Sequence, residues 1–204
     1  DTFLKEDLMK FEEPKIIKFG VKEGRSTKLF LEICKKKGGK LYSIDIDDYS
    51  NLFKDTNWKF IKSRDDNFEL MDQIKNKSFD VIYIDSLHEP NHIKKILYFY
   101  YDFLKLNGRI FIDDINWLPY VKNSFKDNEY SELINRKTFS KIIEIYYANL
   151  ENIQLEFNFN GTGNANILKL KDKKLNEAKK IHNRLFGLRN IIRNILLIKR
   201  KPKM

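Results

Sequence analysis

Short apolar runs alternate with helical patterns along the first half of the chain. The runs fall at 16–19, 41–46, 59–62, 79–84 and 108–112, with helical patterns near 26–33, 68–74 and 92–104. Because most of these runs are continuous instead of alternating with polar residues, they predict parallel strands that helices bury on both faces. The expected fold class is α/β, with a doubly wound, mostly parallel sheet.

The second half of the chain predicts a helix and then a hairpin. A helical pattern falls near 139–150, and residues 153–159 and 166–170 flank the turn sequence Gly161-Thr162-Gly163-Asn164. We therefore expect the parallel sheet to end in an antiparallel pair. Residues 116–150 form an insertion before that pair, and the sequence leaves two interpretations open, a substrate lid or ordinary surface packing.

The 204-residue chain has a net charge of +10, and the surplus is confined to its C-terminal segment. Residues 171–204 hold 12 of the 39 basic and 2 of the 29 acidic side chains, which leaves 27 of each in residues 1–170. We expect a neutral domain over 1–170 and a basic helical extension over 171–204. A hydrophobic share of 42% excludes a disordered chain.

The extension predicts an amphipathic helix from Leu175 onward, because apolar residues recur there at helical spacing. They are Ala178, Ile181, Leu185, Leu188, Ile192, Ile195 and Leu196. Such a helix can pack on its own domain, form a homodimer, lie on an anionic membrane surface or contact nucleic acid. Nucleic acid is the less expected partner, since the body of the chain has balanced charge.

Targeting signals are not evident in this sequence. It has no apolar window long enough for a membrane-spanning helix, and no signal-peptide pattern. The one cysteine, Cys34, excludes an internal disulfide and a multi-cysteine zinc site. We expect a cytoplasmic protein, with peripheral membrane contact as an option.

Glycine and acidic residues stand where the first two strands are expected to end. Gly20 and Gly24 would let the backbone approach a ligand, and Ser26 begins a helix. Asp45 stands where a carboxylate can accept hydrogen bonds from ribose hydroxyls, although it could equally cap the following loop. A Walker motif and the third glycine of a dinucleotide fingerprint are both missing, so a single adenosine with a zwitterionic tail fits better.

Three carboxylates follow two neighbouring strands, Asp85 after one and Asp113 with Asp114 after the other. Hard divalent cations such as Mg²⁺ prefer clustered oxygen ligands, although a solvated turn is the alternative for the Asp113–Asp114 pair. His88 is close enough in sequence to share this rim, where a neutral imidazole can take a hydroxyl proton. His92 would suit a zinc pair with His88, but we expect it to be exposed at the start of a helix.

These residues together resemble a class I S-adenosylmethionine-dependent methyltransferase. The resemblance is to the metal-dependent O-methyltransferase type, which includes catechol and sugar O-methyltransferases and the related cephalosporin-hydroxylase-like group. It rests on IKFGVKEGRST, LYSIDID, FDVIYIDSLHEPNH and GRIFIDDINW. The Asp-x-x-His spacing of Asp85 and His88 resembles the sugar and macrolide enzymes, whereas the catechol enzymes have a lysine at the base position.

The resemblance implies a Rossmann-like methyltransferase fold, S-adenosylmethionine as cofactor and Mg²⁺ or another divalent cation. It assigns the methionine part of the cofactor to Gly20, Gly24 and Ser26, the ribose to Asp45, the adenine to Ser63, Asp65 and Asp66, and a further cofactor contact to Asp85. Asp85, Asp113 and Asp114 would hold the metal, and His88 would be the catalytic base. The implied reaction is methyl transfer to a hydroxyl of a sugar or other small molecule.

Position 18 departs from the family pattern. The family usually has an acidic residue there, which helps to hold the amino group of the cofactor, whereas this chain has Lys18. We expect Lys18 to turn away from the cofactor or to pair with Glu23 or Asp45. Two alternative functions follow from the sequence: a non-catalytic binding or assembly module, motivated by Lys18, and a nucleic-acid methyltransferase that uses the basic tail.

Overall fold

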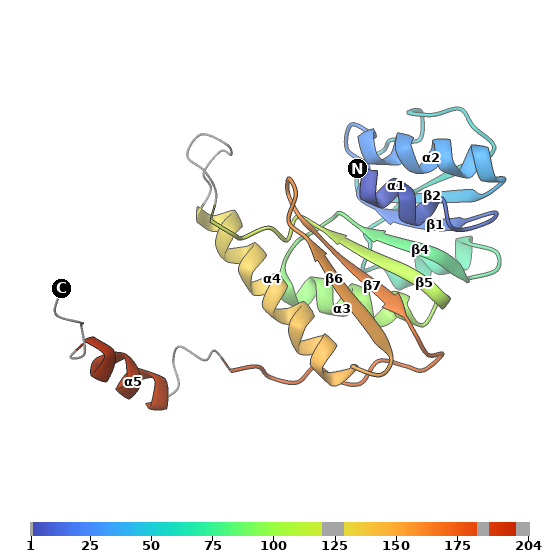
Figure 1. The fold of residues 1–204 in the computed structure, drawn as a ribbon. Coiled ribbons are helices and arrows are strands. Elements are labelled where there is room, and N and C mark those ends of the chain that lie inside the picture. The colour runs from blue at the N-terminus through green and yellow to red at the C-terminus, as the bar shows by residue number, and fades with distance from the viewer. Residues whose placement is uncertain (1, 120–128, 183–187, 199–204) are drawn as a thin grey trace.

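The computed structural model describes residues 2–119, 129–182 and 188–198. Its elements are α1 (Thr2–Leu8), β1 (Lys15–Phe19), α2 (Arg25–Lys37), β2 (Lys40–Asp45), β3 (Trp58–Lys62), the 3₁₀ helix η1 (Phe68–Gln73), β4 (Phe79–Ile84), α3 (Pro90–Tyr101), β5 (Leu104–Asp113), α4 (Glu129–Ala148), β6 (Ile153–Asn158), β7 (Asn164–Lys169) and α5 (Leu188–Ile198). Helices cover both faces of a central sheet (Figure 1).

The sheet has seven strands in the order β3-β2-β1-β4-β5-β7-β6. Neighbours from β3 to β5 are parallel, whereas β7 runs antiparallel to both β5 and β6. The predicted fold class, a doubly wound Rossmann-like sheet that ends in an antiparallel hairpin, is confirmed. The strand order reverses beside β1, so ligands are expected at the carboxyl ends of β1 and β4.

Strand β1 contributes to a hydrophobic core on each face of the sheet. Ile17 and Phe19 belong to the core that includes side chains of α3 and α4, and Ile16 belongs to the core that includes side chains of α1 and α2. Since side chains alternate along a strand, Lys18 falls on the same face as Ile16, and it is also fully buried. Strand β1 therefore carries one buried cation close to its carboxyl end.

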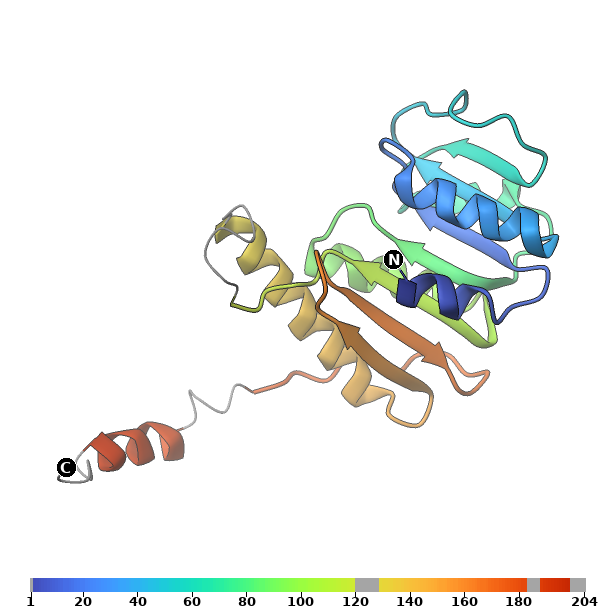
Figure 2. The same cartoon turned by 45° about the horizontal axis from the view of Figure 1, so that its top comes forward.

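Helix α1 was not predicted from the sequence, and it covers strands from the opposite end of the chain (Figure 2). Its buried Asp7 lies 3.6 Å from Arg109 of β5 and accepts a hydrogen bond of 3.2 Å from Asn166 of β7. These contacts fix α1 to the sheet, because a buried carboxylate needs charged or polar partners.

Several predicted boundaries are corrected by the structure. Strand β5 begins at Leu104 instead of residue 108, because Leu104 pairs with Phe79 before a register irregularity. Asn107 has a φ of 62°, which turns the chain at that irregularity. Helix α4 begins at Glu129, ten residues before the predicted start, and part of the predicted insertion, residues 120–128, lies outside the described residues.

The helix predicted from Leu175 is wrong for residues 175–182, which are not helical. Residues 175–179, here called the strap, pack across α3 and α4. The backbone amide of Asn176 donates to the side chain of Asn149 (2.8 Å), and that of Lys179 donates to the carbonyl of Glu144 (3.0 Å). These bonds hold the segment away from helical geometry. The domain division at residue 170 stays a prediction, but the chain beyond it still contacts the domain.

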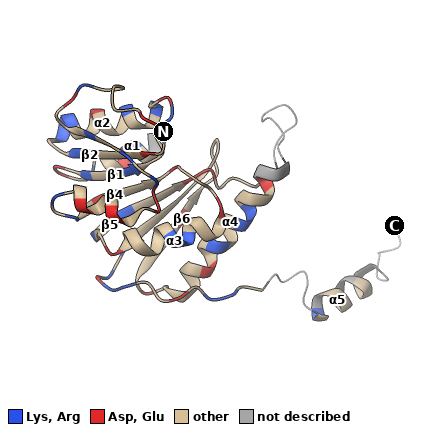
Figure 3. Ribbon diagram, turned by 180° about the vertical axis from the view of Figure 1, so that it is seen from behind, with Lys and Arg blue, Asp and Glu red and all other residues tan. Residues whose placement is uncertain are grey.

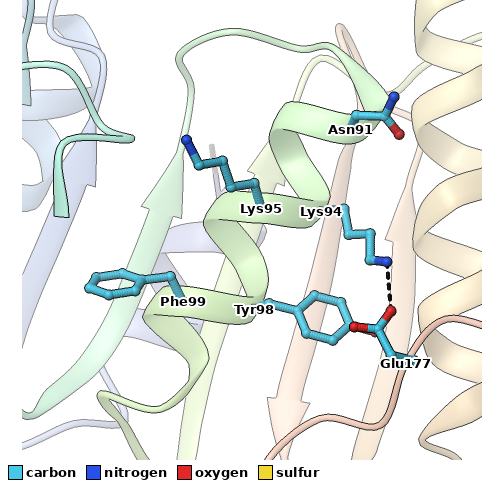
Figure 4. A pocket seen from close by; sticks show the side chains of 6 residues that line it. All are labelled: Asn91, Lys94, Lys95, Tyr98, Phe99 and Glu177. Carbon is cyan, nitrogen blue, oxygen red and sulfur yellow. Dashed lines mark hydrogen bonds and ion pairs between the residues drawn. The ribbon is translucent and has the colours of Figure 1, made fainter.

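The strap and α3 also border a pocket of about 480 Å³. It is lined by Asn91, Lys94, Lys95, Tyr98, Phe99 and Glu177 (Figure 4). Lys94 pairs with Glu177 at 2.7 Å, and Lys95 pairs with Asp66 at 3.3 Å. The charges of the two lysines are thus largely neutralised.

Among the described residues, no helix is long and apolar enough to cross a membrane.

Candidate active site

The loop after β1 lies directly against the loop after β4. Gly20 has a φ of +86°, and a Cβ atom at this position would lie 1.9 Å from the carbonyl oxygen of Asp85. The backbone amide of Asp85 in turn donates to the carbonyl of Phe19 at 3.0 Å. Only glycine fits this close approach, so Gly20 sets the spacing of the two loops where the strand order reverses.

The start of α2 has uncapped backbone amides. Gly24, at the N-cap, has a φ of 76° and makes no side-chain capping bond. The positive φ favours glycine here, whereas the side chain of Leu52, 2.5 Å from a Cβ atom at this position, could move aside. Ser26 is half-buried in the first turn. Free amides at a helix N-terminus attract carboxylates, which suits the predicted contact with the methionine part of the cofactor.

Asp45 at the end of β2 caps backbone amides of two loops. Its Oδ2 accepts a hydrogen bond from the amide of Val21 (2.6 Å), and its Oδ1 accepts one from the amide of Asp47 (3.1 Å). The loop-cap interpretation of Asp45 is thus observed. Each carboxylate oxygen has a second acceptor position, so a ribose contact remains compatible with this geometry.

The residues predicted for adenine are engaged in internal contacts. Oδ2 of Asp65 accepts a hydrogen bond from Ser86 and lies 2.8 Å from Nε2 of His92. The side chain of His92 is only 10% exposed, so the prediction that His92 is exposed was wrong. It faces Asp65 because α3 begins at Pro90 and its first turn points toward the β3 loop.

Asp66 and Ser63 are also paired within the loop after β3. The Arg64 side chain lies 2.8 Å from Asp66, and its hydrogen bond, with a smaller contribution from Lys95, lowers the pKa of Asp66 to about 2. The hydroxyl of Ser63 donates to the carbonyl of Arg64 at 3.1 Å. The loop is thus held in one conformation by its own side chains. The predicted adenine contact of these residues remains a prediction.

Two carboxylates and one imidazole converge beyond the ends of β4 and β5. Nε2 of His88 lies 3.3 Å from Oδ2 of Asp114 and 3.9 Å from Oδ1 of Asp85. One potential ligand atom from each of the three residues lies within 4.8 Å of the others. Nδ1 of His88 is buried and has no hydrogen-bond partner among the described residues. The structure thus assembles an acid–base cluster from segments separated in sequence.

Asp113, the third predicted metal ligand, is outside this group. Its Oδ2 accepts a hydrogen bond from the hydroxyl of Tyr83 (2.6 Å), and its Oδ1 accepts one from Thr162 (3.3 Å). Burial, together with the charge of Asp113, raises the pKa of Tyr83. Asp113 is the last residue of β5, and Asp114 follows it outside the strand with a φ of 53°, so the two carboxylates make different contacts.

A family comparison identifies the part of the chain that carries this cluster. A family model described as a methyltransferase domain matches residues 17–115, from β1 to just beyond β5. Residues 17–115 form a methyltransferase domain. The matched segment includes Gly20, Asp45, Asp85, His88 and Asp114. This segment therefore belongs to the methyltransferase-domain family, and the predicted resemblance to class I, S-adenosylmethionine-dependent methyltransferases is confirmed.

Solved structures share the fold of this methyltransferase at low sequence identity. The S-adenosylhomocysteine-bound methyltransferase PaMTH1 of Podospora anserina is 16% identical, with a TM-score of 0.64 over 82% of this chain and 76% of that one. A candidate caffeoyl-CoA O-methyltransferase from Staphylococcus aureus is 15% identical, with a TM-score of 0.62 over 82% of this chain and 81% of that one.

A third similar structure is longer than this chain. MycE, from the mycinamycin biosynthetic pathway, was solved with Mg and S-adenosylhomocysteine; it is 18% identical, with a TM-score of 0.61 over 84% of this chain. This chain spans 49% of the length of MycE. No curated protein sequence matches the chain significantly.

In this methyltransferase, Lys18 pairs with Asp85 and not with Glu23 or Asp45. Its Nζ lies 3.3 Å from Oδ2 of Asp85, donates to the carbonyl of Gly20 and lies 5.1 Å from the ring centroid of Tyr83. Burial lowers the pKa of Lys18, and Asp85 opposes this shift. Burial likewise raises the pKa of Asp85, and Lys18 opposes it. An ion pair between buried Lys18 and half-buried Asp85 therefore stabilises the floor of the site.

Helix α4 connects the two loops of the methyltransferase cluster, a role that the sequence did not suggest. The hydroxyl of Thr138, which is fully buried, donates to the carbonyl of His88 at 2.7 Å. Nδ2 of Asn135 donates to the carbonyl of Asn116 at 3.0 Å. Of the two acceptors, His88 belongs to the loop after β4 and Asn116 to the loop after β5. The position of the imidazole thus depends on a helix outside the matched segment.

Proposed function

We propose that this methyltransferase transfers a methyl group from S-adenosylmethionine to a hydroxyl of a sugar or another small molecule. The observation that carries the proposal is the convergence of Asp85, His88 and Asp114 at the strand ends. A neutral hydroxyl is a weak nucleophile, so its methylation needs a base close to the acceptor oxygen. An imidazole flanked by carboxylates meets that requirement.

The donor atoms of the cluster suit a hard divalent cation such as Mg²⁺. Asp85 and Asp114 would hold it, since carboxylate oxygens are the ligands that Mg²⁺ prefers and its remaining positions usually keep water or substrate oxygens. Asp113 would add negative charge beside them while bonded to Tyr83. A bound cation of this kind would lower the pKa of a substrate hydroxyl. Imidazole is a poor ligand for Mg²⁺, which leaves His88 free for another role.

His88 would accept the proton of the acceptor hydroxyl. Its Nε2 lies next to Asp114, so a proton on Nε2 is stabilised by that carboxylate. Nδ1 is buried, so the proton would be accepted at Nε2, the ring nitrogen that faces both carboxylates. The rest of the contribution is alignment: the loops after β1 and β4 hold the cofactor side and the acceptor side of the reaction at a fixed distance.

Two similarities support a sugar or macrolide as the class of acceptor. The Asp-x-x-His spacing of Asp85 and His88 is similar to the sugar and macrolide enzymes, and MycE was also solved with mycinamycin VI bound. In this chain, Trp117 lies in the loop after β5, and its ring centroid is 5.6 Å from that of Phe139. Cζ of Arg136 lies 5.7 Å from the ring centroid of Trp117. Nε1 of Trp117 has no acceptor among the described residues. That nitrogen is buried, so the part of Trp117 that suits a hydroxylated ring is its half-exposed aromatic face.

The proposal is tested by calorimetry of S-adenosylhomocysteine binding and by methyl-transfer assays on a panel of sugars and macrolides, with Mg²⁺ and with excess chelator. We expect S-adenosylhomocysteine to bind and transfer to require the cation. Binding without transfer to any hydroxylated acceptor would contradict the O-methyl proposal. Undiminished transfer in chelator would contradict the role of the cation.

The first prediction concerns the metal. Substitution Asp114→Asn is expected to weaken Mg²⁺ activation of methyl transfer by at least about 10-fold, because even indirect partners of metal ligands contribute 10- to 100-fold to affinity. The measurement is the Mg²⁺ concentration that gives half-maximal activity. Asp72→Asn, on an exposed carboxylate that pairs with Lys77, serves as the control. An unchanged Mg²⁺ requirement in Asp114→Asn would remove Asp114 from the proposed metal site.

The second prediction concerns Thr138 as a positioning residue. Thr138→Val keeps the shape of the side chain but leaves the His88 carbonyl without its donor, so we expect kcat to fall by about 10-fold through displacement of the imidazole. Thr138→Ser retains a hydroxyl and is expected to restore most of that loss. S-adenosylhomocysteine affinity, measured by calorimetry, should stay constant in both variants. Equal kcat values for the valine and serine variants would show that the hydrogen bond does not position His88.

A further inference from the structure

Helix α5 presents an apolar stripe to solvent. Ile191, Ile192, Ile195 and Leu196 are between 46% and 53% exposed, and Leu188 is 78% exposed. Their spacing places them along one side of the helix, which spans Leu188–Ile198. Among the described residues, the hydrophobic clusters of the domain end at the strap, with Leu175 and Ala178. The stripe is therefore an amphipathic face that the domain itself does not cover.

The charge around α5 is of one sign. After Glu177 the sequence holds nine basic residues and no acidic residue. Two of them, Arg189 and Arg193, lie within α5, and Lys199, Arg200, Lys201 and Lys203 follow it in the sequence. In Figure 3, by contrast, acidic and basic residues are interspersed along the ribbon of the sheet and its helices. The partner of α5 should therefore combine an apolar layer with negative charge.

We propose that α5 binds to the surface of an anionic lipid bilayer, lying in the interface with its isoleucine stripe in the acyl region. A bilayer that contains acidic lipids offers both of the required properties in one surface. Basic residues close to such a surface interact favourably with its negative potential, and each contributes about a fivefold gain in binding. The apolar stripe alone would be a poor anchor, and so would the charge alone.

A second copy of the chain fits these observations less well. An apolar stripe along 11 residues spans fewer than two heptads, whereas stable coiled coils usually sustain three or four. Two paired tails would also bring like charges together, because neither contains an acidic residue after Glu177. A nucleic acid would match the charge but would leave the isoleucines in water. The bilayer offers an apolar layer to the stripe and negative charge to the basic residues.

The strap makes α5 a tether for the catalytic domain. The strap is bonded to the domain through Asn149 and Glu144, and only eight residues separate Lys179 from Leu188. Extended chain spans at most about 3.6 Å per residue, so these eight residues reach roughly 30 Å or less. A bilayer-bound α5 would thus keep the methyltransferase domain within about one domain diameter of the lipid surface.

The test is sedimentation of the full-length protein with lipid vesicles. We expect it to bind vesicles of phosphatidylcholine with phosphatidylserine, to bind vesicles of phosphatidylcholine alone at least 10-fold more weakly, and to be released as salt is raised. Circular dichroism should show a gain of helix with the acidic vesicles, since a short helix is marginal in water and is stabilised at an interface.

Two variants separate the contributions of the stripe and the charge. Ile195→Asn is expected to weaken binding to acidic vesicles by at least about 10-fold, because it removes a large apolar side chain from the stripe. Arg189→Gln together with Arg193→Gln is expected to weaken it by roughly 25-fold. The matched control is Leu150→Asn, on a leucine of the domain that is 54% exposed, compared with 53% for Ile195; it should bind like the unchanged protein.

Three outcomes would overturn the proposal. The first is no binding to acidic vesicles, and the second is binding that Ile195→Asn and Leu150→Asn weaken equally. The third is a different occupant: a concentration-dependent dimer that Ile195→Asn dissociates, or nucleic-acid binding that survives Ile195→Asn. Methyl transfer to a soluble acceptor should be unchanged in Ile195→Asn, so failure of this proposal can be distinguished from failure of the proposed reaction.

Discussion

Replacement of His88 by alanine should lower kcat for methyl transfer by about 10²- to 10⁴-fold, the usual contribution of a positioned general base. The imidazole is the group in the cluster placed to accept the hydroxyl proton, because the two carboxylates would hold the cation. Because His88 lies on the acceptor side of the site, S-adenosylhomocysteine affinity should stay within about twofold. Calorimetry checks the affinity, and initial rates at saturating cofactor check kcat.

The control for His88 is His182→Ala, which removes an exposed histidine beyond the strap and should leave kcat unchanged. His88→Gln is a second variant that keeps a polar side chain in the half-buried site, so that loss of activity can be separated from loss of packing. A folded His88→Gln enzyme with full kcat would exclude His88 as the base, whatever the metal does.

Gly20→Ala should cause the largest loss of stability among single substitutions in the site. A Cβ atom at residue 20 would lie 1.9 Å from the Asp85 carbonyl oxygen, which is backbone and cannot rotate away. The φ of +86° adds strain of about 1–2 kcal/mol for any residue with a Cβ atom. We expect the free energy of unfolding to fall by about 4 kcal/mol or more, in the range reserved for severe steric conflicts. Urea denaturation measures this change.

Gly161→Ala separates the two causes. Gly161 also has a positive φ, +60°, but a Cβ atom there would have no neighbour within 4 Å. It should therefore show only the conformational strain, about 1–2 kcal/mol. The excess loss in Gly20→Ala then measures the contact between the two loops. Equal losses in the two variants would mean that the loop after β4 moves aside at little cost.

Sequence reasoning identified the fold and most of the cluster because both depend on strand order. Gly20, Asp85, His88 and Asp114 follow strands whose carboxyl ends meet at one edge of a parallel sheet. Asp113 shows the limit of that reasoning. Its carboxylate is bonded to Tyr83 and Thr162, contacts that no pattern in the sequence indicates.

Other features depend on contacts that carry no local sequence signal. Lys18 was recognisable as a departure, but its pairing with Asp85 follows from the register between β1 and β4. The apolar spacing of residues 175–182 fits a helix as well as it fits the observed strap. The strap is held by hydrogen bonds to the side chain of Asn149 and the backbone carbonyl of Glu144. The bond from Thr138 to the His88 carbonyl joins residues 50 positions apart. Such pairs become visible only when the chain is folded.

The position of β7 has a consequence for the order in which the domain can be built during synthesis. β7 lies between β5 and β6, so β6 has no sheet neighbour until the later strand has emerged. Asp7 in α1 likewise waits for Asn166, 159 residues further along the chain. Such non-local pairings slow folding because the intervening chain must close first. The parallel strands can therefore pair while the chain is still on the ribosome. The pairing of β6 and the hydrogen bond between Asp7 and Asn166 can form only after β7 has been synthesised.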